Sequence, residues 1–137
     1  MGIDARIETE PGECLAKLGD PHNRLNWLLR LAVLDSTLCL RFIDPYGMTV
    51  FNRPQLLVLH SEFSSLASRV TEPDLLEAKR IYLERPEGTP KAALEEMREA
   101  VETLSLDDLR HHLEGLLRLV SDAVARGPHH YIRFVAD

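Results

Sequence analysis

Residues 41–52 read RFIDPYGMTVFN and contain the strongest turn signal in the chain. Asp44 at the first position of a turn, Pro45 at the second and Gly47 at the fourth are typical of type I geometry. If Gly47 is left-handed, a G1 bulge follows and Asp44 lies opposite Met48. The stretch therefore predicts a bulged β-hairpin with a single apolar face. The residues of that face are Leu38, Leu40, Phe42, Met48 and Val50.

The same stretch places an acid and a tyrosine at a bend, as many catalytic loops do. Turn geometry alone accounts for each residue type, because Asp44 bonds backbone groups, Pro45 fixes a dihedral angle and Gly47 permits the left-handed region. A catalytic Asp44 would need a second titratable group nearby, and the sequence nominates none. We therefore interpret this stretch as structural.

Strand patterns lie at both ends of the chain. Residues 3–8 alternate apolar and polar side chains, as a half-buried strand does, and residues 130–137 (HYIRFVAD) read as another strand. TEPG at 9–12 breaks the first strand, so we interpret 9–19 as a loop. Together with the hairpin, these strands predict a small, mainly antiparallel sheet of about four strands.

Capping residues followed by apolar side chains at helical spacing predict several helices. Asp20, Asn52, Thr71 and Ser105 are the predicted caps, and Gly127 with Pro128 is a strong stop signal. The predicted buried stripes are Leu25, Leu28, Leu29, Ala32 and Val33; Leu56, Leu59, Phe63, Leu66 and Val70; Leu75, Ala78, Ile81 and Tyr82; Leu94, Met97, Val101 and Leu104; and Leu109, Leu113, Leu116, Val120 and Val124.

The order of strand, helix, hairpin, helices and strand predicts one α+β domain over residues 1–137, with several helices packed on one face of the sheet. The helical segment 71–127 is compatible with an insertion between sheet elements.

Composition narrows the function classes. The chain has 137 residues and a formal net charge of −6, which argues against a general nucleic-acid binder and against binding to an anionic membrane surface. No apolar run approaches the length of a membrane span. Two cysteines, Cys14 and Cys39, are too few for a disulfide framework or a zinc site. We expect a cytoplasmic protein without a cofactor.

The histidines do not form a metal-binding pattern. His111 and His112 are adjacent on a predicted helix and point about 100° apart, whereas a helical zinc pair needs i, i+4 spacing. No Gly-x-Ser-x-Gly elbow or phosphate-binding glycine loop occurs. We therefore expect no metal site and no catalytic residue. A small-ligand binder or hydrolase with a site near Asp44, or near His129 and His130, stays open as an alternative.

Two predicted surfaces suit a protein partner. The first is acidic and comprises Glu95, Glu99, Glu102, Asp107 and Asp108. A field of one sign accelerates association with a basic partner, although such residues can also form a merely solvated face.

The second predicted surface is the sheet face opposite the helices. It combines arginine with aromatic residues, a composition that interface cores favour. A solvated face, or one covered by the 9–19 loop, is the alternative. The residues expected to bind there are Arg6, Arg41, Phe51, Tyr131 and Arg133, flanked by Asp4, Glu8, Ile43 and Val135.

The opening MGID, the hairpin LRFIDPYGMTVFN and the ending YIRFVAD together resemble a group of small bacterial proteins of the immunity and accessory type, encoded beside toxins or defence systems. The resemblance covers the sheet-forming parts and carries over no catalytic residue. It implies a non-enzymatic protein-binding module, an inhibitor or accessory protein that docks through the acidic helical surface on a partner protein. The alternative is a structural subunit that self-assembles into a homo-oligomer through the Arg/Tyr/Phe sheet face.

Overall fold

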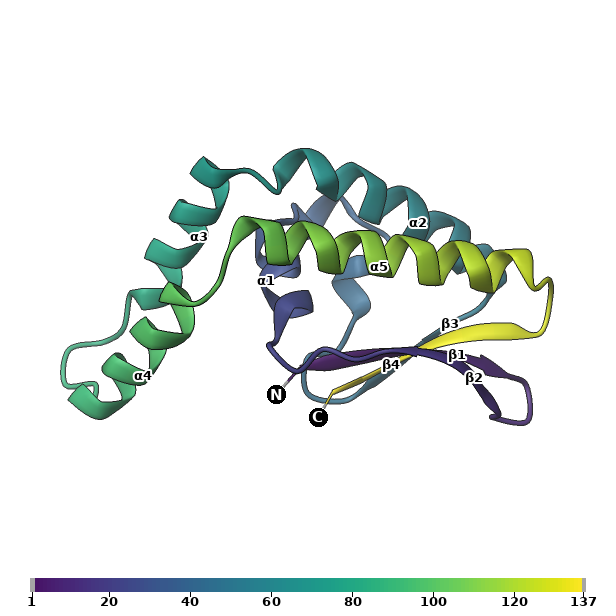
Figure 1. Ribbon diagram of the computed structural model, residues 1–137, viewed down its shortest axis with the longest axis horizontal. Coiled ribbons are helices and arrows are strands. Elements are labelled where there is room, and N and C mark those ends of the chain that lie inside the picture. Colours follow the sequence, from purple (N-terminus) through teal and green to yellow (C-terminus); the bar gives the residue numbers. More distant parts are fainter. Residues whose placement is uncertain (1, 137) are drawn as a thin grey trace.

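The computed structural model describes residues 2–136, so the two end residues of the expected domain lie outside the described part. A four-stranded antiparallel sheet, in the order β2-β1-β4-β3, forms one layer, and helices cover one of its faces (Figure 1). The predicted α+β class, with a small antiparallel sheet and helices on one face, is confirmed. The strands are β1 (Ile3–Thr9), β2 (Cys14–Leu18), β3 (Met48–Phe51) and β4 (His130–Ala136).

The first and last strands pair in the middle of the sheet. Ile3 lies opposite Ala136 and Ile7 opposite Ile132, which brings the two ends of the chain close together (Figure 1). Alternate residues of both strands point toward the helices, as the period-two pattern predicts. These core residues, each at most 1 % exposed, are Ile3, Ala5, Ile7, Ile132 and Phe134.

Two long helices, α2 (Arg53–Leu66) and α5 (Leu106–Ala125), cover the sheet, and α1 (Arg24–Leu31) packs against α5 (Figure 1). Asn52 and Gln55 form a reciprocal capping box at the start of α2, and Ser105 accepts a hydrogen bond from the Asp108 backbone N–H at the start of α5. Both predicted caps are confirmed. The buried stripe residues are Leu56, Leu59, Phe63, Leu66, Leu109, Leu113, Leu116 and Val120.

Helices α3 (Glu72–Leu83) and α4 (Lys91–Glu102) form an antiparallel pair that extends beyond the end of the sheet, at the left of Figure 1. We call this pair the arm. It buries few of its side chains: α3 buries Leu75, and α4 buries Val101. Ile81, predicted to be buried, is 49 % exposed. The arm therefore presents most of its surface to solvent.

The first half of the predicted hairpin is wrong. The chain there forms short 3₁₀ turns, η1 (Leu34–Ser36) and η2 (Leu40–Phe42), and a third, η3 (Ala67–Arg69), follows α2. The Glu62 carboxylate on α2 accepts hydrogen bonds from the backbone N–H groups of Leu38, Cys39 and Leu40 at 2.6, 2.8 and 3.2 Å. A strand would need these donors in a ladder, so Glu62 holds the segment in a different conformation.

The turn after this segment does form. The Gly47 N–H reaches the Asp44 carbonyl at 3.5 Å, and the Asp44 carboxylate accepts a hydrogen bond from the Tyr46 N–H at 2.9 Å. The Asp44 N–H donates to the Thr49 hydroxyl at 2.9 Å. The predicted turn at Asp44 is therefore confirmed, although it joins a 3₁₀ turn to β3 instead of joining two strands. The left-handed Gly47 expected for a G1 bulge is wrong, because Gly47 is not among the described glycines with positive φ.

The interpretation of residues 9–19 as a loop is also wrong, because β2 lies within them. Gly12, with φ at 95°, donates its N–H to the Thr9 carbonyl at 2.9 Å, and Thr9 donates its N–H to Glu13 at the same distance. TEPG therefore reverses the chain between two strands. Ala16 pairs with Ile7 across the resulting hairpin.

Three residues expected on the outer sheet face lie elsewhere. Phe51 pairs with Ile132, which places both side chains on the same face, and Phe51 is 3 % exposed in the core. Ile43 is buried and Arg41 belongs to η2, because no strand forms at 38–44. In the observed phase of β3, Met48 and Val50 take the outer face instead.

Candidate functional site

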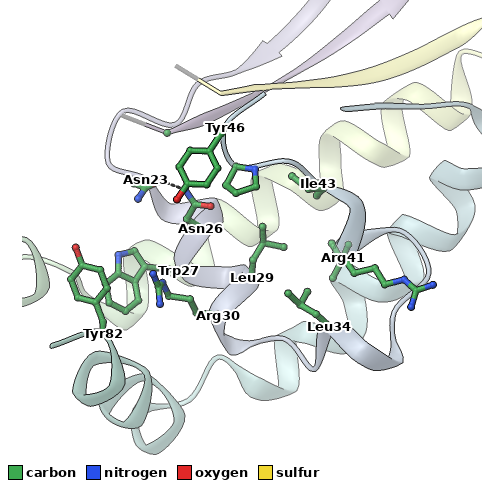
Figure 2. A pocket seen from close by; sticks show the side chains of 13 residues that line it. Asn23, Asn26, Trp27, Leu29, Arg30, Leu34, Arg41, Ile43, Tyr46 and Tyr82 are labelled. Atoms are coloured by element: carbon green, nitrogen blue, oxygen red, sulfur yellow. Dashed lines mark hydrogen bonds between the residues drawn. The ribbon is translucent and has the colours of Figure 1, made fainter. Parts of the chain in front are cut away.

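A hollow of about 560 Å³ lies beside α1, between the Asp44–Gly47 turn, η2 and α3 (Figure 2). We call it the α1 hollow. Its apolar lining comes from α1 and the segment that follows it, since the 3₁₀ turns fold back over the helix. The apolar lining residues are Leu29, Leu34, Leu40 and Ile43.

An aromatic pair closes one end of the α1 hollow. The rings of Trp27 on α1 and Tyr82 on α3 have centroids 4.9 Å apart and planes tilted by 59°. The guanidinium of Arg30 lies 5.6 Å from the Trp27 centroid and 5.0 Å from the Tyr82 centroid. These cation–π contacts fix the Arg30 head group and tie the arm to the body of the protein.

Polar side chains stand over the middle of the hollow. Tyr46 is 91 % exposed, and its hydroxyl points toward Asn23 and Asn26 (Figure 2). The Asn26 amide donates to the Asn23 side-chain oxygen at 2.5 Å. Asn23 has φ at 58°, the left-handed region that asparagine tolerates better than most residues. The hollow thus combines an apolar floor with hydrogen-bonding groups at its rim.

A second hollow, of about 600 Å³, lies on the other side of the Trp27–Tyr82 pair. It is lined by the base of the arm and the start of α1, including Leu104 and the ion pair between Arg24 and Asp108 at 3.6 Å. The aromatic pair therefore separates two adjoining depressions between arm and body.

Asp20, which is 1 % exposed, organises the start of α1 beneath these hollows. Its carboxylate accepts hydrogen bonds from the backbone N–H groups of Arg24 at 2.7 Å, Leu25 at 3.1 Å and Ile3 at 3.2 Å. The prediction of Asp20 as the N-cap, with Pro21 in the first turn, is wrong in position: the helix begins at Arg24 and its N-cap residue is Asn23. The Asp20 carboxylate still binds the first N–H groups of the helix, from three residues before the cap. Asp20 joins the first turn of α1 to β1.

Two further titratable groups surround Asp20. His112 is buried, and burial lowers the pKa of its imidazole, although the Asp20 carboxylate acts in the opposite direction. Burial alone would raise the pKa of Asp4, but the Asp20 N–H and the Lys17 ammonium leave it below its ordinary value. Their burial, and the bonding of both carboxylates to backbone groups, indicate a structural polar cluster.

The structure divides the predicted acidic surface between two elements. Glu95, Glu99 and Glu102 are exposed on α4 in the arm. Asp107 and Asp108 lie in the first turn of α5, where carboxylates interact favourably with the helix dipole. Asp108 is also paired with Arg24, so it is partly committed to internal contacts.

The outer sheet face brings together Arg6, Tyr131 and Arg133 of the predicted set, without Arg41 and Phe51. Two ion pairs cross it, from Lys17 to Asp4 at 3.1 Å and from Arg133 to Glu8 at 2.9 Å. In the described part of the chain the buried Nε of Arg6 has no hydrogen-bond partner. The face is a ladder of charges with exposed Met48 and Val50 at one edge.

The two places named for the enzyme alternative lie at opposite ends of β4: His129 and His130 at its start, and the Asp44–Gly47 turn beside its last residue. His129 is exposed and 3.3 Å from Glu10, and the Nδ1 of His130 lies 3.1 Å from the Pro128 carbonyl. The Asp44 carboxylate is engaged in its own turn. Over residues 2–136, no group of three or more His, Cys, Asp or Glu side chains is placed to hold a metal ion.

Comparison of the chain with protein-family models, curated proteins and solved structures finds no match. None of the described helices is both long and apolar enough to cross a bilayer.

Sequence reasoning missed the α1 hollow. The available signal was the spacing of Trp27 and Arg30, which lie three residues apart on one helix face. Tyr82 comes from a distant helix and could not be placed beside them.

Proposed function

We propose that the protein is a non-enzymatic protein-binding module, an inhibitor or accessory protein of the immunity type, which docks on a basic surface of a partner protein. The observation that carries this proposal is the exposure of the arm. Helix α4 presents Glu95, Glu96, Glu99 and Glu102 to solvent on an element that stands off the body (Figure 1).

The charge pattern of α4 is costly for an isolated helix. Glu95 and Glu99 are four residues apart and Glu99 and Glu102 three, and each such pair of like charges destabilises a helix by about 0.2–0.5 kcal/mol. Lys91 lies 3.8 Å from Glu95, but both side chains are largely exposed, so this ion pair is weak. A basic partner surface would offset the repulsion among these glutamates, and its attraction to them would accelerate association of the two proteins.

The arm also offers apolar surface. Leu76 and Ile81 on α3 are 57 % and 49 % exposed. A stable interface needs an apolar core in addition to a charged rim. An acidic α4 beside exposed aliphatic groups on α3 fits a partner whose basic surface contains an apolar patch. The proposal places this interaction in the cytoplasm.

The test reverses three charges of the arm, Glu95→Lys, Glu99→Lys and Glu102→Lys, in one variant. The control variant reverses three exposed acids elsewhere, Glu13→Lys, Asp35→Lys and Asp122→Lys, so that both carry the same net charge. Affinity capture from the native cell is run with wild type and both variants. A partner retained by wild type and control but lost by the arm variant is then purified for stopped-flow measurements.

The expected result is a fall of about tenfold or more in the association rate constant for the arm variant, together with a weaker dependence on salt. If the purified partner binds the arm variant and the wild type at equal rates, the acidic arm is not the docking surface.

Self-assembly through the outer sheet face is the second candidate, because none of the described helices covers that face and Met48 and Val50 are exposed on it (Figure 1). Sedimentation velocity of wild type and of a Val50→Glu variant tests it. A wild-type dimer that the variant dissociates supports this candidate, and a wild-type monomer at high micromolar concentration rejects it.

A further inference from the structure

We propose that the α1 hollow is a second binding site, which takes a peptide segment of a partner that bears a carboxylate next to an apolar side chain. The inference is independent of docking through α4, because the hollow is built by α1, η2 and the Asp44–Gly47 turn, with Tyr82 of α3 at one end.

The charge on the lining of the hollow is positive. The charged side chains that line it are Arg30, whose guanidinium lies beside Trp27 and Tyr82, and Arg41, whose guanidinium points away from the hollow (Figure 2). No carboxylate of the described residues lines it. This contrasts with the net charge of −6 on the whole chain. Neither arginine lies within 4.0 Å of an acidic oxygen in the described part of the structure, so neither charge is neutralised internally. An anionic group is the complementary ligand.

The head group of Arg30 is ordered before any ligand binds. Its guanidinium is held by the faces of Trp27 and Tyr82, with centroid distances of 5.6 and 5.0 Å. Contact with ring faces leaves the N–H edges of a guanidinium free to form two parallel hydrogen bonds with a carboxylate. Less conformational entropy is then lost on binding, because the head group is already ordered.

The floor of the hollow is apolar. Leu40 and Ile43 are buried beneath the hollow, and Leu29 and Leu34 are half-buried in its wall. Such a surface fits one or two aliphatic or aromatic side chains of a ligand. The Asn23 and Asn26 amides and the Tyr46 hydroxyl stand above it and supply hydrogen bonds for a peptide backbone (Figure 2).

The shape favours a segment of a larger partner over a free metabolite. Small-molecule sites usually bury about 70–90 % of their ligand. Here the rim residue Tyr46 is 91 % exposed and Arg30 is also exposed, so a ligand in the hollow stays open along one side. An extended chain can enter and leave along such an open side.

Trp27 provides the readout, because it is the only tryptophan of the chain and lines the hollow. Its fluorescence is titrated with acetylated Leu-Glu-Phe-Glu amide, with the uncharged analogue Leu-Gln-Phe-Gln and with free phenylpropionate. The expected result is a saturable change with the acidic peptide, and binding about tenfold or more weaker with the uncharged analogue. Equal binding of both peptides would overturn the proposal. If phenylpropionate binds as tightly as the acidic peptide, the assignment to a peptide segment is overturned.

Arginine variants locate the contact. Arg30→Gln should weaken binding of the acidic peptide about tenfold or more, and Arg30→Lys should weaken it less, because charge is kept but the planar fork is lost. Arg41→Gln should have a smaller effect, since its head group points away from the hollow (Figure 2). The matched control is Arg53→Gln, an exposed arginine at the start of α2. All variants should keep the wild-type circular dichroism. Unchanged affinity in a folded Arg30→Gln variant would refute the site.

Discussion

The Nε2 atom of His112 lies 4.0 Å from Oδ1 of Asp20, with 5 % and 0 % of the two side chains exposed. The carboxylate already accepts three backbone hydrogen bonds, and among the described residues Nε2 has no hydrogen-bond partner. Burial lowers the pKa of His112, and the charges of Arg24 and His111 act in the same direction, against the attraction of Asp20. The imidazole is therefore neutral in the folded protein at neutral pH.

This arrangement predicts that acid destabilises the fold through His112. Its pKa is lower in the folded state than the unfolded value of about 6.5, so the unfolded chain binds more protons below that pH. The His112 contribution should be complete above about pH 6.5 and be lost as the pH falls, with a slope of at most about 1.4 kcal/mol per pH unit. Urea unfolding between about pH 7 and pH 5 measures it.

A His112→Leu variant should show a flatter pH dependence over this range, because the buried titrating group is gone. The exposed neighbour supplies the control, and His111→Asn should retain most of the wild-type slope. Equal slopes in wild type and His112→Leu would show that other groups cause the acid sensitivity.

Glu62 makes a second prediction, because it accepts three backbone hydrogen bonds from the segment before η2. Glu62→Ala should speed hydrogen exchange at the amides of Leu38, Cys39 and Leu40 and lower the free energy of unfolding by about 1–3 kcal/mol. Exchange followed by NMR measures both local and global effects. Glu114→Ala, an exposed change on α5, should leave these amides unaffected. Unaltered exchange at all three amides in Glu62→Ala would contradict the role given to Glu62.

The contacts of Glu62 show which parts of the fold a local sequence pattern can predict and which it cannot. Helix α2, the end strands and the caps Asn52, Thr71 and Ser105 follow from patterns of at most a few residues, and the structure confirms them. The hairpin failed because its donors are taken by a carboxylate 22–24 residues away. A local pattern carries no information about such a partner.

The error at Phe51 follows from the same cause. Without a strand at 38–44, the register of β3 is set by its pairing with β4 alone. A shift of that register by one residue exchanges the side chains on the two faces of the strand. The α1 hollow was equally inaccessible, since Trp27 and Tyr82 are 55 residues apart in the chain and meet only through the packing of α3 on α1.

The phase of β3 predicts unequal effects of substitution at neighbouring positions. Phe51 packs against Phe134 with ring centroids 5.8 Å apart, so Phe51→Ala should cost about 3–5 kcal/mol of unfolding free energy. Val50 is 45 % exposed on the outer face, and Val50→Ala should cost less than about 1 kcal/mol. Denaturant titrations compare the two. A larger loss of unfolding free energy for Val50→Ala than for Phe51→Ala would show that the two faces of β3 are assigned the wrong way round.

The contact between Trp27 and Tyr82 predicts how the arm is held. Tyr82→Ala removes a ring that packs on Trp27 and carries contacts with Arg30 and Arg85, so the arm should loosen while the sheet stays intact. Amide exchange should accelerate in α3 and α4 but not in β1 or β4, because the arm opens below the free energy of global unfolding. Trp27 emission should also shift to longer wavelength as water reaches the indole.

Tyr46→Ala is the matched control, since it removes the same side chain from a position that is 91 % exposed and should change stability by less than about 0.5 kcal/mol. Tyr82→Phe separates the ring from the hydroxyl and should retain wild-type exchange, because Tyr82 contacts Trp27, Arg30 and Arg85 through its ring. If exchange in Tyr82→Ala rises equally in the arm and in the central strands, the arm is not an independently opening unit. Docking through α4 would then act on a rigid surface, with no need to fix a mobile one.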